Sequence, residues 1–317
     1  MGSGENATMA LRPTLTVLDA SVSLAPHLEA PCWEGRIASV FQTTLLIIGP
    51  GDTLLHLQGG PLLVSPFSLR VSEPLAMIIQ DSSLVEEMPV RKEGARIEVP
   101  GCFRLLVEEV RYHCSPVVTP GQVDPELLAI AKRILRLEGR PGGFDALPGA
   151  RAITAEVQKA LTDGDTDRLL GAARQIIGLG PGLTPSGDDF LVGCLKALWL
   201  LAGRAPEFHS MIDRLRVDLA LDLDDRTTRV GAEFIRHALN GQFAEVLDRA
   251  AQALLMPTTP EATASAVSRL VAQGETSGTD TTRGLLAGLD AVCRVPYRER
   301  VRPSRATARA RAARARS

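Results

Sequence analysis

The segment from Gly178 to Gly193, GLGPGLTPSGDDFLVG, concentrates residue types that bind or transform small ligands. Alternating glycines let backbone N–H groups converge on a ligand oxygen, as in phosphate-binding loops, although the G-K-[ST] of a Walker A motif is absent. The candidate ligand-binding residues here are Gly180, Gly182, Thr184, Ser186 and Gly187, and the candidate catalytic residues are Asp188 and Asp189. The segment therefore predicts a glycine-rich ligand loop that leads into a helix.

A structural alternative accounts for part of the same segment. Gly178 would end one helix, Ser186 would cap the next, and Asp189 would complete an S-x-x-D capping box. This alternative leaves Thr184 and Asp188 without a role. Both interpretations stay open at the level of sequence.

A second segment repeats the pattern S-G-x-D-x-x-x-G 91 residues further along, from Ser277 to Gly284. Capping and close helix packing at Gly193 and Gly284 would again be a structural explanation. Two copies instead favour two helix N-termini that face one pocket. The repeat adds Ser277 and Gly278 to the candidate ligand-binding residues and Asp280 to the candidate catalytic residues.

A third segment, Asp224–Thr228, heads another expected helix. Arg226 can form two hydrogen bonds to a carboxylate or phosphate, so it is a candidate catalytic residue, with Thr227 and Thr228 as candidate ligand-binding residues. The alternative is an exposed first-turn ion pair. We predict that all three segments meet in one pocket.

Histidine and cysteine patterns exclude several enzyme classes. The five histidines show no metal-ligand spacing and no nucleophile-base signature, and no G-x-S-x-G motif occurs, so we interpret the histidines as structural or surface groups. The five cysteines are scattered, which predicts free thiols in a reducing compartment. Serine-hydrolase and zinc-hydrolase readings lose their support.

Charge and hydropathy point to a cytoplasmic protein that binds neither nucleic acid nor membrane. Eight of the 35 Lys and Arg residues lie in residues 298–317, and residues 1–297 carry a net charge of −9. Nucleic-acid affinity needs basic surface, which only this tail offers. The first residues lack a signal-peptide pattern, and no apolar run of about 18 residues is free of charge.

The elements that must position these residues predict an α+β protein. We expect an antiparallel β-rich domain followed by a mostly α-helical domain of about eight helices. Gly49–Asp52 predicts a hairpin, and Asp124-Pro125-Glu126 predicts the start of a helix that Gly139 ends. The expected divisions are a flexible N-terminus (1–13), the β-rich domain (14–120), the helical domain (121–297) and a disordered Arg/Ala tail (298–317). The expected strands are Ile37–Phe41, Leu45–Ile48, Thr53–Leu57, Leu75–Gln80, Ile97–Val99 and Phe103–Val110.

Three segments make the chain resemble the AllH family, related to a subunit of oxamate carbamoyltransferase: Gly178–Gly193, Thr227–Gly241 and Gly274–Gly288. The resemblance implies participation in carbamoyl transfer between oxamate or oxalurate and carbamoyl phosphate, in allantoin and purine breakdown, together with other subunits. Gly231 stands where the family favours a hydroxyl residue, and the Arg-rich tail lies outside the family pattern.

Such a transfer relies on preorganised donors, so a small anionic or phosphorylated metabolite is the expected ligand. Acids at helix starts repel an oxyanion unless Mg²⁺ lies between them, or unless they cap helices and bind an amide N–H₂. One rival interpretation is a non-catalytic subunit whose β domain assembles the complex. Another is a stand-alone binder of a phosphorylated metabolite or a kinase-like enzyme.

Overall fold

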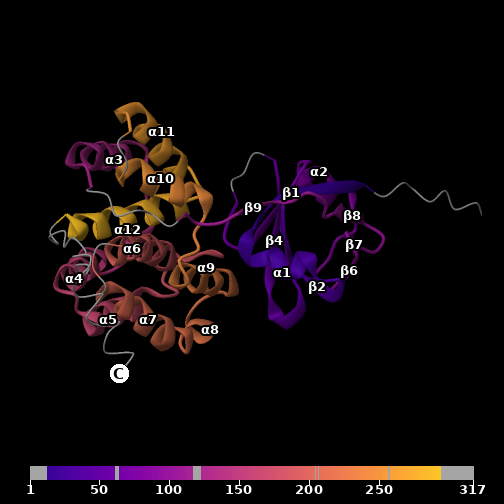
Figure 1. Cartoon of the computed structure of the whole chain (residues 1–317), viewed down its shortest axis with the longest axis horizontal. Coiled ribbons are helices and arrows are strands. Elements are labelled where there is room, and N and C mark those ends of the chain that lie inside the picture. Colours follow the sequence, from indigo (N-terminus) through magenta and orange to yellow (C-terminus); the bar gives the residue numbers. More distant parts are fainter. Residues whose placement is uncertain are drawn as a thin grey trace, which may run out of the picture.

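The computed structural model describes residues 13–60, 64–116, 123–203, 205, 207–255 and 258–293. Strands and helices gather in two separate parts of the molecule (Figure 1). The first part, residues 14–113, is β-rich, and the second is helical, which confirms the expected α+β class. Nearly all of the expected flexible N-terminus, most of the expected boundary and the whole Arg/Ala tail lie outside the described residues.

The β-rich region is a nine-stranded sheet with the order β5-β4-β3-β2-β6-β7-β8-β1-β9, and an additional β5–β1 pairing closes eight strands into a barrel. Most pairings are antiparallel, whereas β1–β8, β1–β9 and β4–β5 are parallel. The strands are β1 (Thr14–Ser21), β2 (Cys32–Val40), β3 (Thr44–Ile48), β4 (Leu54–Gly59), β5 (Ser68–Val71), β6 (Pro89–Glu93), β7 (Arg96–Val99), β8 (Phe103–Leu106) and β9 (Arg111–His113).

The turn between β3 and β4 has the expected hairpin geometry. Gly51 adopts a φ of 62°, which glycine tolerates without steric cost. The Gly49 N–H donates to the Thr53 carbonyl oxygen at 2.8 Å, and this bond closes the turn. The hairpin predicted at Gly49–Asp52 is confirmed.

The strand predicted at Leu75–Gln80 is wrong, because this segment forms helix α2 (Leu75–Asp81). Pro74 precedes the first turn, and Leu75, Ile78 and Ile79 recur at helical spacing against the barrel core. Met77 lies on the opposite face with 68% of its surface exposed. The apolar residues of Leu75–Asp81 are therefore spaced for one face of a helix, not for a strand.

The helical region begins as predicted. Asp124 accepts a hydrogen bond from the Glu126 N–H, Pro125 occupies the first turn, and Gly139 follows the last helical residue. The described α-helices after Val123 are α3 (Pro125–Glu138), α4 (Ala150–Asp163), α5 (Thr166–Ile176), α6 (Ser186–Ala202), α7 (Glu207–Ala220), α8 (Leu223–Arg226), α9 (Arg229–Leu239), α10 (Glu245–Leu255), α11 (Pro260–Val271) and α12 (Ser277–Val292). Across the described ranges, no helix is both long and apolar enough to cross a membrane.

A small apolar cluster joins the two regions. Alternate residues of β3 and β4, such as Leu46 and Leu54, turn away from the barrel core. They pack with Phe67 against Val230 and Phe234 of α9, and the rings of Phe67 and Phe234 meet edge to face at 4.8 Å. The helical region thus covers the outer face of the barrel at β3 and β4.

Candidate functional site

The two S-G-x-D segments begin helices α6 and α12. Ser186 and Ser277 are the first helical residues, preceded by Pro185 and Thr276, and neither preceding residue caps its helix through a side chain. The alternative in which Ser186 and Asp189 form a capping box is therefore wrong, because Ser186 lies inside the helix. Both serines are free for other contacts.

Helices α6 and α12 cross at reciprocal positions. A Cβ atom added to Gly193 would lie 2.1 Å from the Thr281 carbonyl oxygen, and one added to Gly284 would lie 1.9 Å from the Phe190 carbonyl oxygen. Phe190 and Thr281 occupy equivalent places, each directly after the aspartate of its repeat. The close packing expected of these glycines is confirmed, and the two repeats face each other with approximate two-fold symmetry.

The serine of each repeat forms a hydrogen bond with the aspartate of the other repeat. The Ser277 hydroxyl stabilises the charged form of Asp189 by hydrogen bonding, and the Ser186 hydroxyl does the same for Asp280. Thr184 joins the first pair, since its Oγ1 lies 2.8 Å from Ser277 Oγ. These contacts show that the first and second sequence segments, Gly178–Gly193 and Ser277–Gly284, converge, although they lie about 90 residues apart.

Burial dominates the electrostatics of both carboxylates. It raises the pKa of Asp189 well above its usual range, and the charges of Asp280 and Asp188 raise it further, while Ser277 and Thr184 act in the opposite direction. Burial also raises the pKa of Asp280. Protonation of either group is therefore easier in the folded protein than in the unfolded chain.

The two aspartates differ in what covers them. Asp280 is fully buried, its Oδ1 accepts from the Phe144 N–H at 2.7 Å, and Gly143 packs so closely that an added Cβ would lie 2.4 Å from both carboxylate oxygens. Asp189 is 8% exposed and lies in a cavity wall. Its Oδ2, like that of Asp280, is buried and has no hydrogen-bond partner within the described structure, but only Asp189 of the two lines the cavity. An unpaired buried oxygen beside a cavity is the arrangement that a ligand donor would satisfy.

The cavity beside Asp189 has a volume of about 330 Å³ and lies between the two regions. Its walls are mostly apolar, with Val192, Phe234 and Leu270 among them. Its polar and small lining residues come from β3, β4, the loop before β5, the helix starts and two nearby loops: Thr44, His56, Gln58, Ser65, Thr184, Asp189, Gln242, Gln273, Gly274, Ser277, Gly278 and Thr281. This size and mixture suit a small metabolite.

His56 and Gln58 are candidate site residues that sequence reasoning missed. They alternate with Leu55 and Leu57, which face the barrel core, so they lie on the outer face of β4. Burial lowers the pKa of His56 to about 4, so its imidazole is neutral at physiological pH. Alternating polar residues in β4 were the available signal, but nothing nearby in sequence shows that helices cover this face.

The third sequence segment, Asp224–Thr228, joins the site through its threonines. Asp188 accepts hydrogen bonds from the Thr227 hydroxyl and, at 2.7 Å, from the Gly178 N–H. Thr228 caps α9 by accepting from the Gly231 N–H at 3.0 Å, and its hydroxyl donates to the Leu183 carbonyl oxygen. Burial raises the Asp188 pKa, while both of its donors lower it. Asp188 thus fastens the glycine-rich loop to the start of α9.

Comparison with known protein families gives a match over the segment that contains these helices. Residues 176–289 match the family model described as Oxamate carbamoyltransferase subunit AllH. The resemblance to the AllH family is confirmed. No solved structure matches the chain. The matched AllH segment contains all three sequence motifs, whereas His56 and the other barrel residues of the cavity lie outside it.

Two expectations about the AllH segment need correction. Arg226 does not reach the cavity: it is exposed, and its guanidinium donates to the Arg174 carbonyl oxygen at 2.8 Å. The Gly187 N–H is also not available to a ligand, because it donates to the Leu179 carbonyl oxygen at 2.9 Å. The Gly278 N–H is used similarly by Gln273. The chain itself satisfies these helix-start amides.

Other glycines of the AllH segment have backbone roles. Gly180 and Gly182 adopt φ values of 113° and 96°, which glycine tolerates and L side chains rarely adopt. An added Cβ at Gly180 would lie 2.8 Å from the Ser186 nitrogen, and one at Gly187 would lie 1.9 Å from the Ile176 carbonyl oxygen. The glycine-rich sequence is thus explained by a compact loop.

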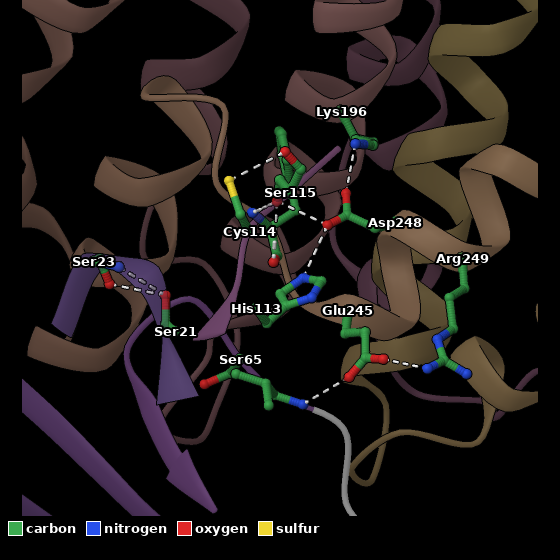
Figure 2. A network of polar contacts seen from close by, with 12 residues as sticks. Ser21, Ser23, Ser65, His113, Cys114, Ser115, Lys196, Glu245, Asp248 and Arg249 are labelled. Atoms are coloured by element: carbon green, nitrogen blue, oxygen red, sulfur yellow. Dashed lines mark hydrogen bonds and ion pairs between the residues drawn. The ribbon is translucent and has the colours of Figure 1, made fainter. Parts of the chain in front are cut away.

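A buried polar network of Lys196, Asp248, Ser115 and His113 lies beside the cavity wall (Figure 2). Lys196 of α6 and Asp248 of α10 form an ion pair at 2.6 Å, with side-chain exposures of 3% and 2%. Asp248 also accepts from Ser115 at 2.7 Å and lies 3.3 Å from His113 Nε2, at the end of β9. The Phe243 N–H donates to Ser115 Oγ at 2.7 Å. The network therefore fixes the chain after β9 to two helices beside the cavity.

The described residues offer little for a metal ion. No group of three or more His, Cys, Asp or Glu side chains that could hold one occurs among them. Asp188 and Asp280 each accept from a backbone N–H, and of these three aspartates only Asp189 lines the cavity. None of the five cysteines, all of which lie in the described ranges, forms a disulfide bond, as the thiols expected from the sequence require.

Proposed function

We propose that this protein acts as a subunit of an oxamate carbamoyltransferase-type complex and that the cavity beside Asp189 holds its ligand. The reaction would transfer a carbamoyl group between oxamate or oxalurate and carbamoyl phosphate, as part of allantoin and purine breakdown. The AllH match over residues 176–289 supports the complex. The unpaired Asp189 Oδ2 in the cavity wall is the single observation that supports a ligand there.

The lining favours the amide end of such a ligand. An amide N–H₂ supplies two donors, which the Asp189 carboxylate can accept. The hydroxyls of Thr184 and Ser277 hold that carboxylate in place. His56 is neutral, so its ring accepts at one nitrogen and donates at the other. Oxamate carries both an amide and a carboxylate, and it belongs to the anionic ligand class expected from the sequence.

A raised pKa also gives Asp189 a role in the reaction. When the acceptor nitrogen attacks the carbamoyl carbon of carbamoyl phosphate, a C–N bond forms, the C–O bond to phosphate breaks, and the nitrogen loses a proton. A buried carboxylate whose pKa is raised by desolvation is suited to receive that proton. We assign this role to Asp189 and a positioning role to Asp188 and Asp280.

The phosphate must be bound by other groups. Among the described residues that line the cavity, none is lysine or arginine. Phosphate binding in carbamoyl transfer needs cationic or backbone donors that neutralise developing charge. A division of the active site between this chain and other subunits would meet that need, and it accords with a subunit that works in a hetero-oligomer.

The test is ligand-dependent melting of the isolated protein with oxamate, carbamoyl phosphate, and ATP with Mg²⁺. Oxamate should raise the melting temperature, and Asp189→Asn should remove that increase, because asparagine has one acceptor oxygen instead of two and turns its own N–H₂ toward the amide of oxamate. Asp225→Asn is the matched control, since Asp225 is exposed on α8. It should leave the oxamate response unchanged.

The outcomes separate the rival interpretations. Stabilisation by ATP with Mg²⁺ but not by oxamate would favour a kinase-like enzyme. No response to any compound, with unchanged melting in Asp189→Asn, would favour a non-catalytic assembly subunit. An oxamate response that survives in Asp189→Asn would contradict the assignment of this cavity.

A further inference from the structure

A second cavity lies on the other side of the α6–α12 pair. Its volume is about 290 Å³, and it is lined mainly by α3, α4 and α12, with Phe190 from α6. Five of its lining residues are charged: Lys132, Arg136, Asp145, Arg283 and Asp290. None of the residues assigned to carbamoyl transfer lines it, so it calls for a separate explanation.

The approximate two-fold symmetry of the helix pair relates the two cavities. Thr281 and Val192 line the first cavity, and their symmetry equivalents, Phe190 and Arg283, line the second. Val192 lies three residues after Asp189, and Arg283 lies three residues after Asp280. The second cavity thus presents a cation at the position where the first presents an apolar side chain.

The residues that line this second cavity include three cations and two carboxylates. Lys132 is paired with Asp290 at 2.5 Å, and Arg283 is paired with Asp145 at 2.6 Å. Arg136 forms no hydrogen bond or ion pair with any residue in the described ranges. Arg136 is therefore the one cation of this lining without a paired carboxylate in the described ranges, whereas Arg283 pairs with both Asp145 and the buried Asp280.

The existing ion pairs are of the kind that a ligand can displace. The Asp145 side chain is 66% exposed, and the Lys132 side chain is 38% exposed. Pairs this exposed contribute little to stability, because water screens them and side-chain entropy opposes them. Arg283 is held more firmly, since its Nη1 also donates to the buried Asp280 at 3.1 Å. Its guanidinium is therefore oriented before any ligand arrives.

We propose that this second cavity is an anion-binding site for the carboxylate or phosphate group of a small metabolite, with Arg136, Arg283 and Lys132 as its cationic donors. Arginine offers a planar pair of N–H donors that matches either group. The apolar side chains of Leu135 and Leu286 in the same lining leave room for an uncharged remainder of the ligand.

The experiment is isothermal titration calorimetry of the full-length protein with inorganic phosphate or oxalate, at constant pH and ionic strength. Arg136→Gln should weaken binding of the preferred anion roughly five- to tenfold, the effect of losing one charge-assisted contact. Arg136 is exposed, so this variant should fold. Arg133→Gln is the matched control, because Arg133 is exposed on the same helix but does not line the cavity.

A third variant separates the two cavities. Asp189→Asn alters only the first cavity, so anion binding at the second should persist there within about twofold. Failure of both anions to bind the wild-type protein would overturn the proposal. So would equal losses in Arg136→Gln and Arg133→Gln, or a loss in Asp189→Asn. Comparison of phosphate with oxalate identifies which of the two groups the site prefers.

Discussion

Substitution of Asp248 by alanine tests the buried network that holds the cavity wall. The Lys196 and Asp248 side chains are 3% and 2% exposed and lie 2.6 Å apart. Without Asp248, the Lys196 ammonium would remain buried, with the Phe243 ring at 4.6 Å as its compensating contact. Removal of one partner of such a pair costs about 3–5 kcal/mol, since the remaining charge is uncompensated. Ser115 would also lose an acceptor.

Denaturant unfolding measures this loss as a change in the free energy of unfolding. Arg249→Ala is the control on the same helix, because Arg249 is 52% exposed and should cost no more than about 1 kcal/mol. The double variant Lys196→Met/Asp248→Leu removes both charges and should recover most of the loss. The reasoning is refuted if Asp248→Ala costs less than about 1 kcal/mol, or if the double variant is no more stable than the single one.

Three further substitutions or titrations test the helix crossing and the site electrostatics. Gly284→Ala should destabilise the protein by about 1–3 kcal/mol in denaturant unfolding, because its Cβ would meet a backbone carbonyl. Gly171→Ala, at an exposed position of α5 with open space around it, should be neutral or stabilising. The raised Asp189 pKa means that its contribution to stability is present at low pH and lost as pH rises through the folded value. Asp189→Asn should therefore gain stability relative to wild type between pH 4 and pH 8 in parallel melting curves, and a constant difference would contradict the burial argument. The His56 ring protons should titrate near pH 4 by NMR, and an inflection near 6.5 would show that the ring is solvated.

Local chemistry predicted much of the fold. The first helix of the helical region is predicted closely, because its start is marked by Asp124 and Pro125 and its end by Gly139. Leu75–Gln80 has no such unambiguous signal, because a short apolar run suits a strand or a helix, and contact with the barrel core decides between them. Barrel closure through β5 and β1 depends on pairings far apart in sequence, which no local pattern contains.

The candidate site also contains features that the sequence predicted and features that only the tertiary structure reveals. The repeated S-G-x-D pattern correctly placed Asp189 beside Ser277, because two similar helix starts in one chain have a reason to meet. The pattern did not show that Gly187 would satisfy its own amide within the chain. Arg226 was misplaced because residue type says nothing about direction, and its guanidinium turns to the α5 carbonyl oxygen of Arg174. His56 comes from a distant strand, so only the tertiary fold brings it to the cavity.

The reciprocal crossing of α6 and α12 has a consequence for how this protein can vary. Gly193 and Gly284 each contact the backbone of the opposite helix, so no side-chain rearrangement on the partner can make room for a larger residue. Separating the helices to accommodate one would also draw Ser277 away from Asp189 and Ser186 away from Asp280. Substitutions at these positions should therefore show strong epistasis with one another, and the α6–α12 pair should evolve as a single unit.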